Sequence, residues 1–236
     1  MLSIYKREML AYFTSPLVYV YMGAYLVIMG LFFTLDNLFT ASSITTNFFS
    51  DILFFSMILL PMLTMRLLSD ERRNKTDQLL ITAPRSIWDI VLGKYFAACT
   101  VFLLSLLITG IYMAIIGVYG ILAIPSTLTN YLGLFLLGCG VISIGVLISA
   151  MTESQIIACI ATVGATLLLQ FMQYLGSIIT IPFVPTILNW LSIYERVYIF
   201  TNGILSLSAV VYMVSFCLVF IFLTVQVIEK RRWSEA

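Results

Sequence analysis

The side chains that could do chemistry are concentrated in one stretch of the chain, from Arg66 to Lys94. It holds ten of the 23 charged residues, counting 12 Lys and Arg and 11 Asp and Glu. They are Arg66, Asp70, Glu71, Arg72, Arg73, Lys75, Asp77, Arg85, Asp89 and Lys94. Arg66 and Asp70 are four residues apart and are spaced to pair along one helix turn. Because apolar segments flank the stretch on both sides, we expect a folded loop in water, with the helix of the preceding span running on into it.

Catalytic and metal-binding patterns are missing from the sequence. The chain has no histidine, which is the commonest metal ligand and general base. Its four cysteines are single, without CxxC spacing, and fall in apolar segments, so we expect neither a disulfide nor a metal site. Gly93 and Lys94 are followed by Tyr95, whereas a phosphate-binding loop has serine or threonine at this place. We therefore expect that the chain is not an enzyme by itself and binds no cofactor.

The composition is that of an integral membrane protein. Of the 236 residues, 61% are hydrophobic and 10% are charged, with a mean hydropathy of +1.08. Soluble domains carry roughly 25% charged residues. The net charge of +1 gives no reason to expect a nucleic-acid partner. Acids and bases are nearly absent from the apolar segments, which counts against an ion-coupled carrier, a channel or an intramembrane enzyme.

Length and hydropathy predict a single all-α domain, residues 1–236, with six membrane spans. The spans are expected at about 17–35, 51–65, 95–116, 131–151, 155–175 and 207–228. Residues 2–13 have apolar side chains on one side and predict an amphipathic elbow helix lying in the interface. Residues 176–206, interrupted by Pro182 and Pro185, predict short helices lying on or dipping into the outer leaflet before the sixth span.

Turn residues indicate where two of the helices begin. The sequence from Ser86 to Asp89 has the capping-box pattern, so a helix is expected to begin there. Gly117, Gly120, Pro125 and Asn130 predict a turn between the third and fourth spans, with the fourth span beginning near residue 131.

Lysine and arginine predict the orientation. With six spans, the N-terminus, the 66–94 loop, the turn at Glu153 and the C-terminus fall on one side. That side holds eleven of the twelve basic residues and leaves only Arg196 opposite. By the positive-inside rule this side is cytoplasmic.

The charged loop contains a segment suited to docking. Thr76 can cap a short helix that ends before Pro84, and Leu79 and Leu80 give this helix an apolar patch. The expected docking residues are Glu71, Arg72, Arg73, Thr76, Asp77, Leu79, Leu80 and Pro84. Docking on another protein and packing back on the same domain or on lipid are both open at this point.

Polar and small residues within the spans allow two interpretations. Thr166, Gln170 and Gln173 could line a substrate route, because an amide that faces lipid without a partner is costly. Hydrogen bonding between helices is the alternative. Small residues in the fourth and fifth spans predict close approach of neighbouring helices; they are Gly138, Gly140, Gly145, Ala161, Gly164 and Ala165.

Nearly the whole chain resembles the permease subunits of the ABC type-2 family, the type V exporter class. The similarity is carried by the opening REMLAYFTSPLVYV, by PMLTMRLLSDERRNKTDQLLITAPRSIWDIVLGK, and by YERVYIFTNGILSL with the final EKRRW. The middle stretch is the most specific. The residues that match the family pattern are Glu71, Arg73, Thr76, Leu79, Leu80, Pro84, Ser86, Gly93 and Lys94. The family usually has glycine before the threonine, whereas this chain has Lys75.

The resemblance, which is strongest to the short permeases of bacterial gliding-motility systems, implies a specific assembly. It implies a cytoplasmic coupling helix between the second and third spans, and a dimer of permease chains carrying two separate ABC ATPase subunits. ATP and magnesium would be bound by those ATPases. It further implies a bacterial inner membrane, with the N- and C-termini cytoplasmic, and export of amphipathic or lipid-like cargo. A membrane anchor or mechanical subunit that moves no cargo is the alternative.

Overall fold

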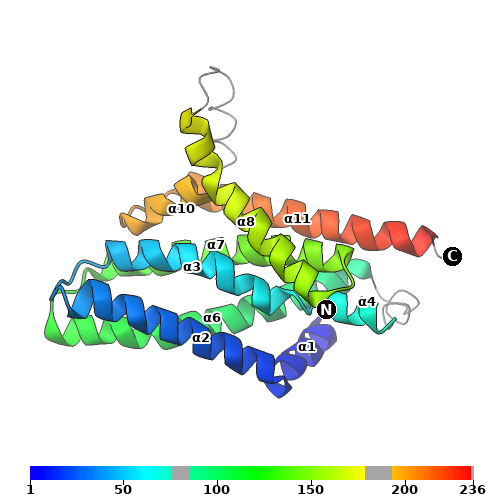
Figure 1. Cartoon of the computed structure of the whole chain (residues 1–236), viewed down its shortest axis with the longest axis horizontal. Coiled ribbons are helices and arrows are strands. Elements are labelled where there is room, and N and C mark those ends of the chain that lie inside the picture. Colours follow the sequence, from blue (N-terminus) through cyan, green and yellow to red (C-terminus); the bar gives the residue numbers. More distant parts are fainter. Residues whose placement is uncertain (76–85, 179–192, 235–236) are drawn as a thin grey trace.

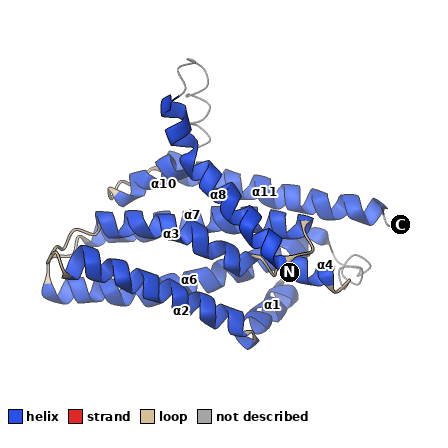
Figure 2. Ribbon diagram, in the orientation of Figure 1, coloured by secondary structure: helices blue, strands red, loops and turns tan. Residues whose placement is uncertain are grey.

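A computed structural model describes residues 1–75, 86–178 and 193–234, and every regular element in those ranges is a helix (Figure 2). Six of the helical segments are long and apolar enough to cross a membrane. The chain is therefore an all-α polytopic membrane protein, as the sequence predicts.

The helices follow one another with short connections. Their bounds are α1 Leu2–Thr14, α2 Pro16–Phe33, the π-helix η1 Thr34–Leu38, α3 Thr46–Thr64, α4 Ser69–Arg73, α6 Ile87–Tyr119, α7 Ile124–Met151, α8 Gln155–Ile178, α10 Ile193–Thr201 and α11 Leu207–Ser234. The helix α1 corresponds to the expected elbow helix, and α2, α3, α6, α7, α8 and α11 to the six expected spans.

The helices define two ends of the bundle. The connections from α2 to α3 and from α6 to α7 lie at one end, and α1, α4 and the C-terminus lie at the opposite one (Figure 1). The second end, called the N-terminal end below, also holds the turn between α7 and α8, because Arg72 of α4 forms an ion pair with Glu153. The segments that the sequence placed on one side of the membrane are thus at the same end of the bundle.

The helix α7 is the centre of the fold and packs against α3, α6, α8, α10 and α11. Two of its glycines make this possible. A Cβ atom at Gly138 would lie 2.0 Å from Cε1 of Phe102, and one at Gly145 would lie 2.1 Å from Oγ1 of Thr64. The expected close approach is confirmed at these positions. It was wrong for Gly164, around which a Cβ atom would meet no atom within 4 Å.

Several helices, among them α6 and α7, begin earlier than their expected spans. The helix α7 begins at Ile124 instead of near residue 131. Pro125 occupies its first turn, where the N–H group that proline lacks would have no partner within the helix. The helix α6 begins at Ile87 after Ser86, as the capping box predicts, but the Ser86 side chain makes no capping hydrogen bond. The Asp89 carboxylate pairs instead with the N-terminal ammonium of Met1, 3.5 Å away.

The expectation that the second span runs unbroken into the charged loop was wrong. The helix α3 ends at Thr64, residues 65–68 form turns, and α4 begins at Ser69. The break is stabilised by Ser149 of α7, whose Oγ accepts the backbone N–H groups of Leu68 and Ser69 at 3.1 and 3.0 Å. These N–H groups lie at the start of α4, where helical partners are missing.

Part of the expected outer segment 176–206 lies outside the described residues. Within the described part, α10 is a short helix that packs on α7. A Cβ atom at Gly133 of α7 would lie 2.6 Å from Cβ of Phe200, so this glycine is what lets α10 come close.

Candidate functional site: a charge cluster at the N-terminal end

The short helix α4 is joined to the ends of several other helices. Besides its contacts with Ser149, Asp70 accepts a hydrogen bond from the Gln155 amide at the start of α8. Arg72 forms an ion pair of 3.1 Å with Glu153 and donates to the backbone carbonyl of Met151, at the end of α7. A helix of five residues would not be stable alone. Its position is therefore set by these side-chain contacts with α7 and α8.

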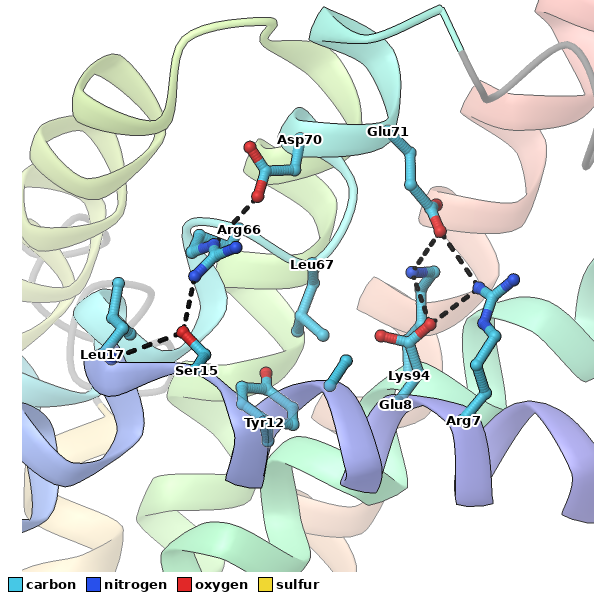
Figure 3. Close-up of a pocket in the computed structure, with 11 residues that line it drawn as sticks. Arg7, Glu8, Tyr12, Ser15, Leu17, Arg66, Leu67, Asp70, Glu71 and Lys94 are labelled. Atoms are coloured by element: carbon cyan, nitrogen blue, oxygen red, sulfur yellow. Dashed lines mark hydrogen bonds and ion pairs between the residues drawn. The ribbon is translucent and has the colours of Figure 1, made fainter.

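A cluster of four charged residues joins α4 to α1 and α6 (Figure 3). Nζ of Lys94 lies 3.1 Å from Oε1 of Glu8 and 2.9 Å from Oε1 of Glu71. Nη2 of Arg7 lies 2.8 Å and 3.1 Å from the same two oxygens. Each carboxylate is thus shared by two cations. We call Arg7, Glu8, Glu71 and Lys94 the charge cluster.

The charge cluster is buried around its lysine. The Lys94 side chain is 2% exposed, whereas that of Arg7 is 55% exposed. A buried ammonium needs carboxylate partners, because taking a lone charge out of water costs several kcal/mol or more. The hydrogen bond with Glu8 raises the pKa of Arg7, with a further contribution from the charges of Glu8 and Glu71. Removing the two carboxylates would leave the buried Lys94 ammonium without a counter-charge.

The preceding glycine explains how the charge cluster can form. A Cβ atom at Gly93 would lie 3.0 Å from Cγ2 of Ile4, so glycine lets α1 lie close against α6. The hydroxyls of Tyr5 and Thr100 are 3.0 Å apart across the same contact. The Gly-Lys pair therefore has a structural role: the glycine admits the elbow helix, and the lysine holds it through Glu8.

A second set of contacts joins the turn between α1 and α2 to the end of α3. Ser15 caps α2 by accepting the backbone N–H of Leu17 at 3.3 Å, and its Oγ also accepts from Nη1 of Arg66 at 2.7 Å. Nε of Arg66 pairs with Asp70 at 2.8 Å, which confirms the pair that the spacing predicts. The buried Tyr12 hydroxyl donates to the Leu63 carbonyl at 3.0 Å.

A cleft of about 290 Å³ lies between these two sets of contacts (Figure 3). Its lining residues come from α1, the start of α2, the turn after α3, α4 and α6. They are Arg7, Glu8, Ala11, Tyr12, Ser15, Leu17, Arg66, Leu67, Asp70, Glu71 and Lys94. Within the described ranges, no group of three Cys, Asp or Glu side chains is placed to hold a metal ion.

The structure describes only some of the expected docking residues. Glu71 and Arg72 lie in α4 and are engaged in ion pairs within the chain, and Arg73 is exposed at the end of α4. The remaining expected docking residues lie outside the described residues; they are Thr76, Asp77, Leu79, Leu80 and Pro84. The docking role itself stays a prediction.

The residue before Thr76 has a backbone conformation that favours glycine. Lys75 has φ +55°, in the left-handed region, and its N–H bonds to the Arg72 carbonyl at 3.1 Å, just after the end of α4. Glycine is the usual residue at this place after a helix. Lys75 thus adopts the left-handed backbone conformation that glycine would adopt most easily.

The residues of the expected substrate route lie on α8. Thr166 is buried, and its hydroxyl bonds within α8 to the Thr162 carbonyl at 2.9 Å and across to the Met57 carbonyl of α3 at 3.3 Å. Gln170 is 6% exposed, and its Oε1 makes no hydrogen bond. The side chain of Gln173 lies outside the described residues. Thr166 therefore makes the interhelical bond that was the alternative to a route.

Sequence reasoning missed Glu8 and the pairing of Lys94. The only signal was a single acid, Glu8, next to two basic residues in an otherwise apolar elbow helix. Glu8 and Lys94 are 86 residues apart, so no local spacing could have paired them.

Comparison with known proteins does not assign the chain. No protein-family model matches it, and no curated protein matches it. Function must therefore be argued from the geometry of the site and from the motifs described above.

Proposed function

We propose that this chain is the membrane-spanning subunit of an ATP-driven ABC transporter. In this proposal it works with a second permease chain and two separate ATPase subunits in a bacterial inner membrane, with both termini and the charge cluster facing the cytoplasm. The ATPases bind ATP and magnesium. The cargo class that suits the proposal is amphipathic or lipid-like, moved outward.

The observation that carries the proposal is the way α4 is held. The helix leads, through Lys75, directly into the 76–85 segment, where the expected docking residues lie. It is also bonded to α1 and α6 through the charge cluster, to α7 through Ser149 and Arg72, and to α8 through Asp70. A displacement applied to 76–85 would therefore reach the ends of four helices. Such an arrangement suits a part that transmits force to membrane spans.

The proposed mechanism begins with ATP binding, which brings the two ATPases together. The 76–85 segment, seated on an ATPase, follows that movement. Leu79 and Leu80 supply apolar contact, as buried leucines do in protein interfaces, and the exposed Arg73 adds a charge that selects the partner. The ion pairs of Glu71 and Arg72 pass the movement to α1, α6 and α7, and with them to the spans.

A non-transporting membrane anchor or mechanical subunit, driven by an associated ATPase, is the second candidate. The hydroxyl of Thr166 favours it, because this hydroxyl is engaged with Met57 and Thr162 and does not offer a free donor to a cargo. In this alternative the same coupling loop and the same charge cluster transmit the movement of the ATPase to the membrane helices, but no substrate is transported.

Copurification tests the proposal. The tagged chain is extracted in mild detergent together with the ATPase encoded beside it, and wild type is compared with Leu79→Asp/Leu80→Asp. The matched control is Ile121→Asp/Leu122→Asp, which places the same charges at two consecutive apolar residues in the connection between α6 and α7, at the opposite end of the bundle (Figure 1). We expect the ATPase to accompany wild type and the control, and to be lost with the first variant. If no ATPase accompanies the wild-type chain in any mild detergent or lipid, the proposal fails.

A further inference from the structure

The cleft beside the charge cluster lies at the depth of lipid headgroups. Leu17 is the second residue of the first span, which begins at Pro16, and Arg66 and Leu67 follow the end of α3 at Thr64, near the end of the second span at Arg73. The elbow helix α1, which lies outside the spans, supplies a further wall, and Asp70, Glu71 and Lys94 complete the lining. A cleft bounded by the first residues of one span and the last residues of another sits where the bilayer meets water.

The polar wall of the cleft is balanced in charge. It contains three bases, Arg7, Arg66 and Lys94, and three acids, Glu8, Asp70 and Glu71. A simple anion or cation would disturb this balance of charge and would compete with the ion pairs that the side chains already form. A ligand that carries one positive and one negative group would keep it.

Both signs of charge are accessible in the cleft. The side chains of Arg7 and Arg66 are 55% and 41% exposed, and that of Asp70 is 26% exposed. A guanidinium has five N–H donors. The described bonds of Arg7 use only Nη2, and those of Arg66 use only Nε and Nη1. Further donors therefore remain for a phosphate, and the Asp70 carboxylate can accept from an ammonium.

The apolar wall continues onto the lipid-facing surface of the first span. Ala11, Tyr12, Leu17 and Leu67 line the cleft. Val20 and Val27 are 60% and 62% exposed, and they follow Leu17 by three and ten residues, which places them on its side of α2. A volume of about 290 Å³ is at the lower limit of small-molecule pockets, about 300–1,000 Å³, so it suits a headgroup whose chains extend along α2.

We propose that this cleft binds the headgroup of a zwitterionic phospholipid with a primary ammonium, of the phosphatidylethanolamine type. Its phosphate accepts hydrogen bonds from Arg66 or Arg7, its ammonium donates to Asp70, and its acyl chains lie against Leu17 and Val20. The lipid fills the space between α1, α2 and α4 and stays with the chain as a bound component. This inference does not depend on the ATPase, and it is tested on the purified chain alone.

The test is native mass spectrometry of the purified chain with an equal mixture of phosphatidylethanolamine, phosphatidylglycerol and phosphatidylcholine of the same acyl composition. We expect about tenfold preferential retention of phosphatidylethanolamine, the ratio that corresponds to one charge-assisted hydrogen bond. Ala11→Trp fills the cleft and should abolish the preference. Leu10→Trp is the matched control, because Leu10 is 67% exposed and not among the lining residues; it should leave the preference unchanged.

Two further measurements keep the proposal falsifiable if Ala11→Trp does not fold. Asp70→Asn keeps the shape of the side chain and removes one negative charge, so the preference should move toward phosphatidylglycerol. Soluble glycerophosphoethanolamine should not displace the lipid, because it lacks the chains that contact α2. Equal retention of the three lipids by wild type, an unchanged preference in Asp70→Asn, or displacement by the soluble headgroup would each overturn the proposal.

Discussion

The charge cluster predicts an unusual order of stabilities among wild type, a double variant and a triple variant. In Glu8→Gln/Glu71→Gln the Lys94 ammonium stays buried and loses both carboxylates, which now lie 3.1 and 2.9 Å from it. A glutamine amide can still accept a hydrogen bond but does not neutralise the charge. Leaving one partner of a buried ion pair without its counter-charge costs about 3–5 kcal/mol.

Adding Lys94→Met to that double variant should restore stability. The triple variant has no buried charge at this place, and methionine has a volume close to that of the lysine side chain. The only charge of the cluster that remains in the triple variant is that of Arg7, whose side chain is 55% exposed. We therefore expect the triple variant to be more stable than the double variant, although it carries one more substitution in the same cluster.

The order can be measured by thermal unfolding in detergent. For a domain of about 150–250 residues, 1 kcal/mol shifts the Tm by about 2–4 °C, so the double variant should unfold about 6–20 °C below wild type. The triple variant should regain most of that loss. Lys6→Met is a control, because Lys6 is exposed on α1 and should leave the Tm within about 2 °C of wild type. A double variant as stable as wild type, or a triple variant less stable than the double, would refute the reasoning about the buried lysine.

Three other outcomes follow from the structure and can be measured in the same unfolding assay. Gly138→Ala should destabilise the chain by about 1–3 kcal/mol, since its Cβ atom would overlap the ring of Phe102. The control Gly140→Ala should not, because its Cβ atom would lie 3.8 Å from its nearest neighbour; equal losses at the two glycines would contradict the packing of α7 against α6. Lys75→Gly should stabilise by about 1 kcal/mol by relieving the left-handed backbone, and a clear loss would show that this conformation is not the stable one. Tyr12→Phe should cost about 1 kcal/mol, because it removes one buried hydrogen bond; an unchanged Tm would mean that the hydroxyl contributes nothing.

The spans could be predicted from the sequence because the cause is local. A helix must satisfy its own backbone hydrogen bonds in lipid, and about 20 apolar residues are long enough to cross it. The pairing of Arg66 with Asp70 was equally local, because they are only four residues apart, although Arg66 lies in the turn before α4. The starts of helices were less certain. Pro125 indicated a turn in the sequence but occupies the first turn of α7, and both roles are common for proline.

The candidate site could not be predicted, because its parts come together only in the folded chain. Arg7 and Glu71 are 64 residues apart, and Glu8 and Lys94 are 86 apart. The break between α3 and α4 depends on Ser149, a residue of the fourth span whose hydroxyl reaches the backbone at Leu68. Neither contact has a spacing that a sequence pattern could show. The sequence shows that charged residues are concentrated in this loop, but it does not show their partners.

The central claim is that α4 and the charge cluster pass the movement of the 76–85 segment to α1 and α6. Hydrogen exchange on the copurified complex, with and without ATP, tests it most directly, by comparing wild type with the triple variant Glu8→Gln/Glu71→Gln/Lys94→Met. In wild type, the account predicts that ATP changes exchange in α4, in α1 and at the start of α6 together. In the triple variant, the change should no longer reach α1 and the start of α6, whereas α7 and α8 stay bonded to α4 through Ser149, Arg72 and Asp70. An ATP effect that is limited to the loop in wild type, or that reaches α1 and α6 unchanged in the triple variant, would contradict the account.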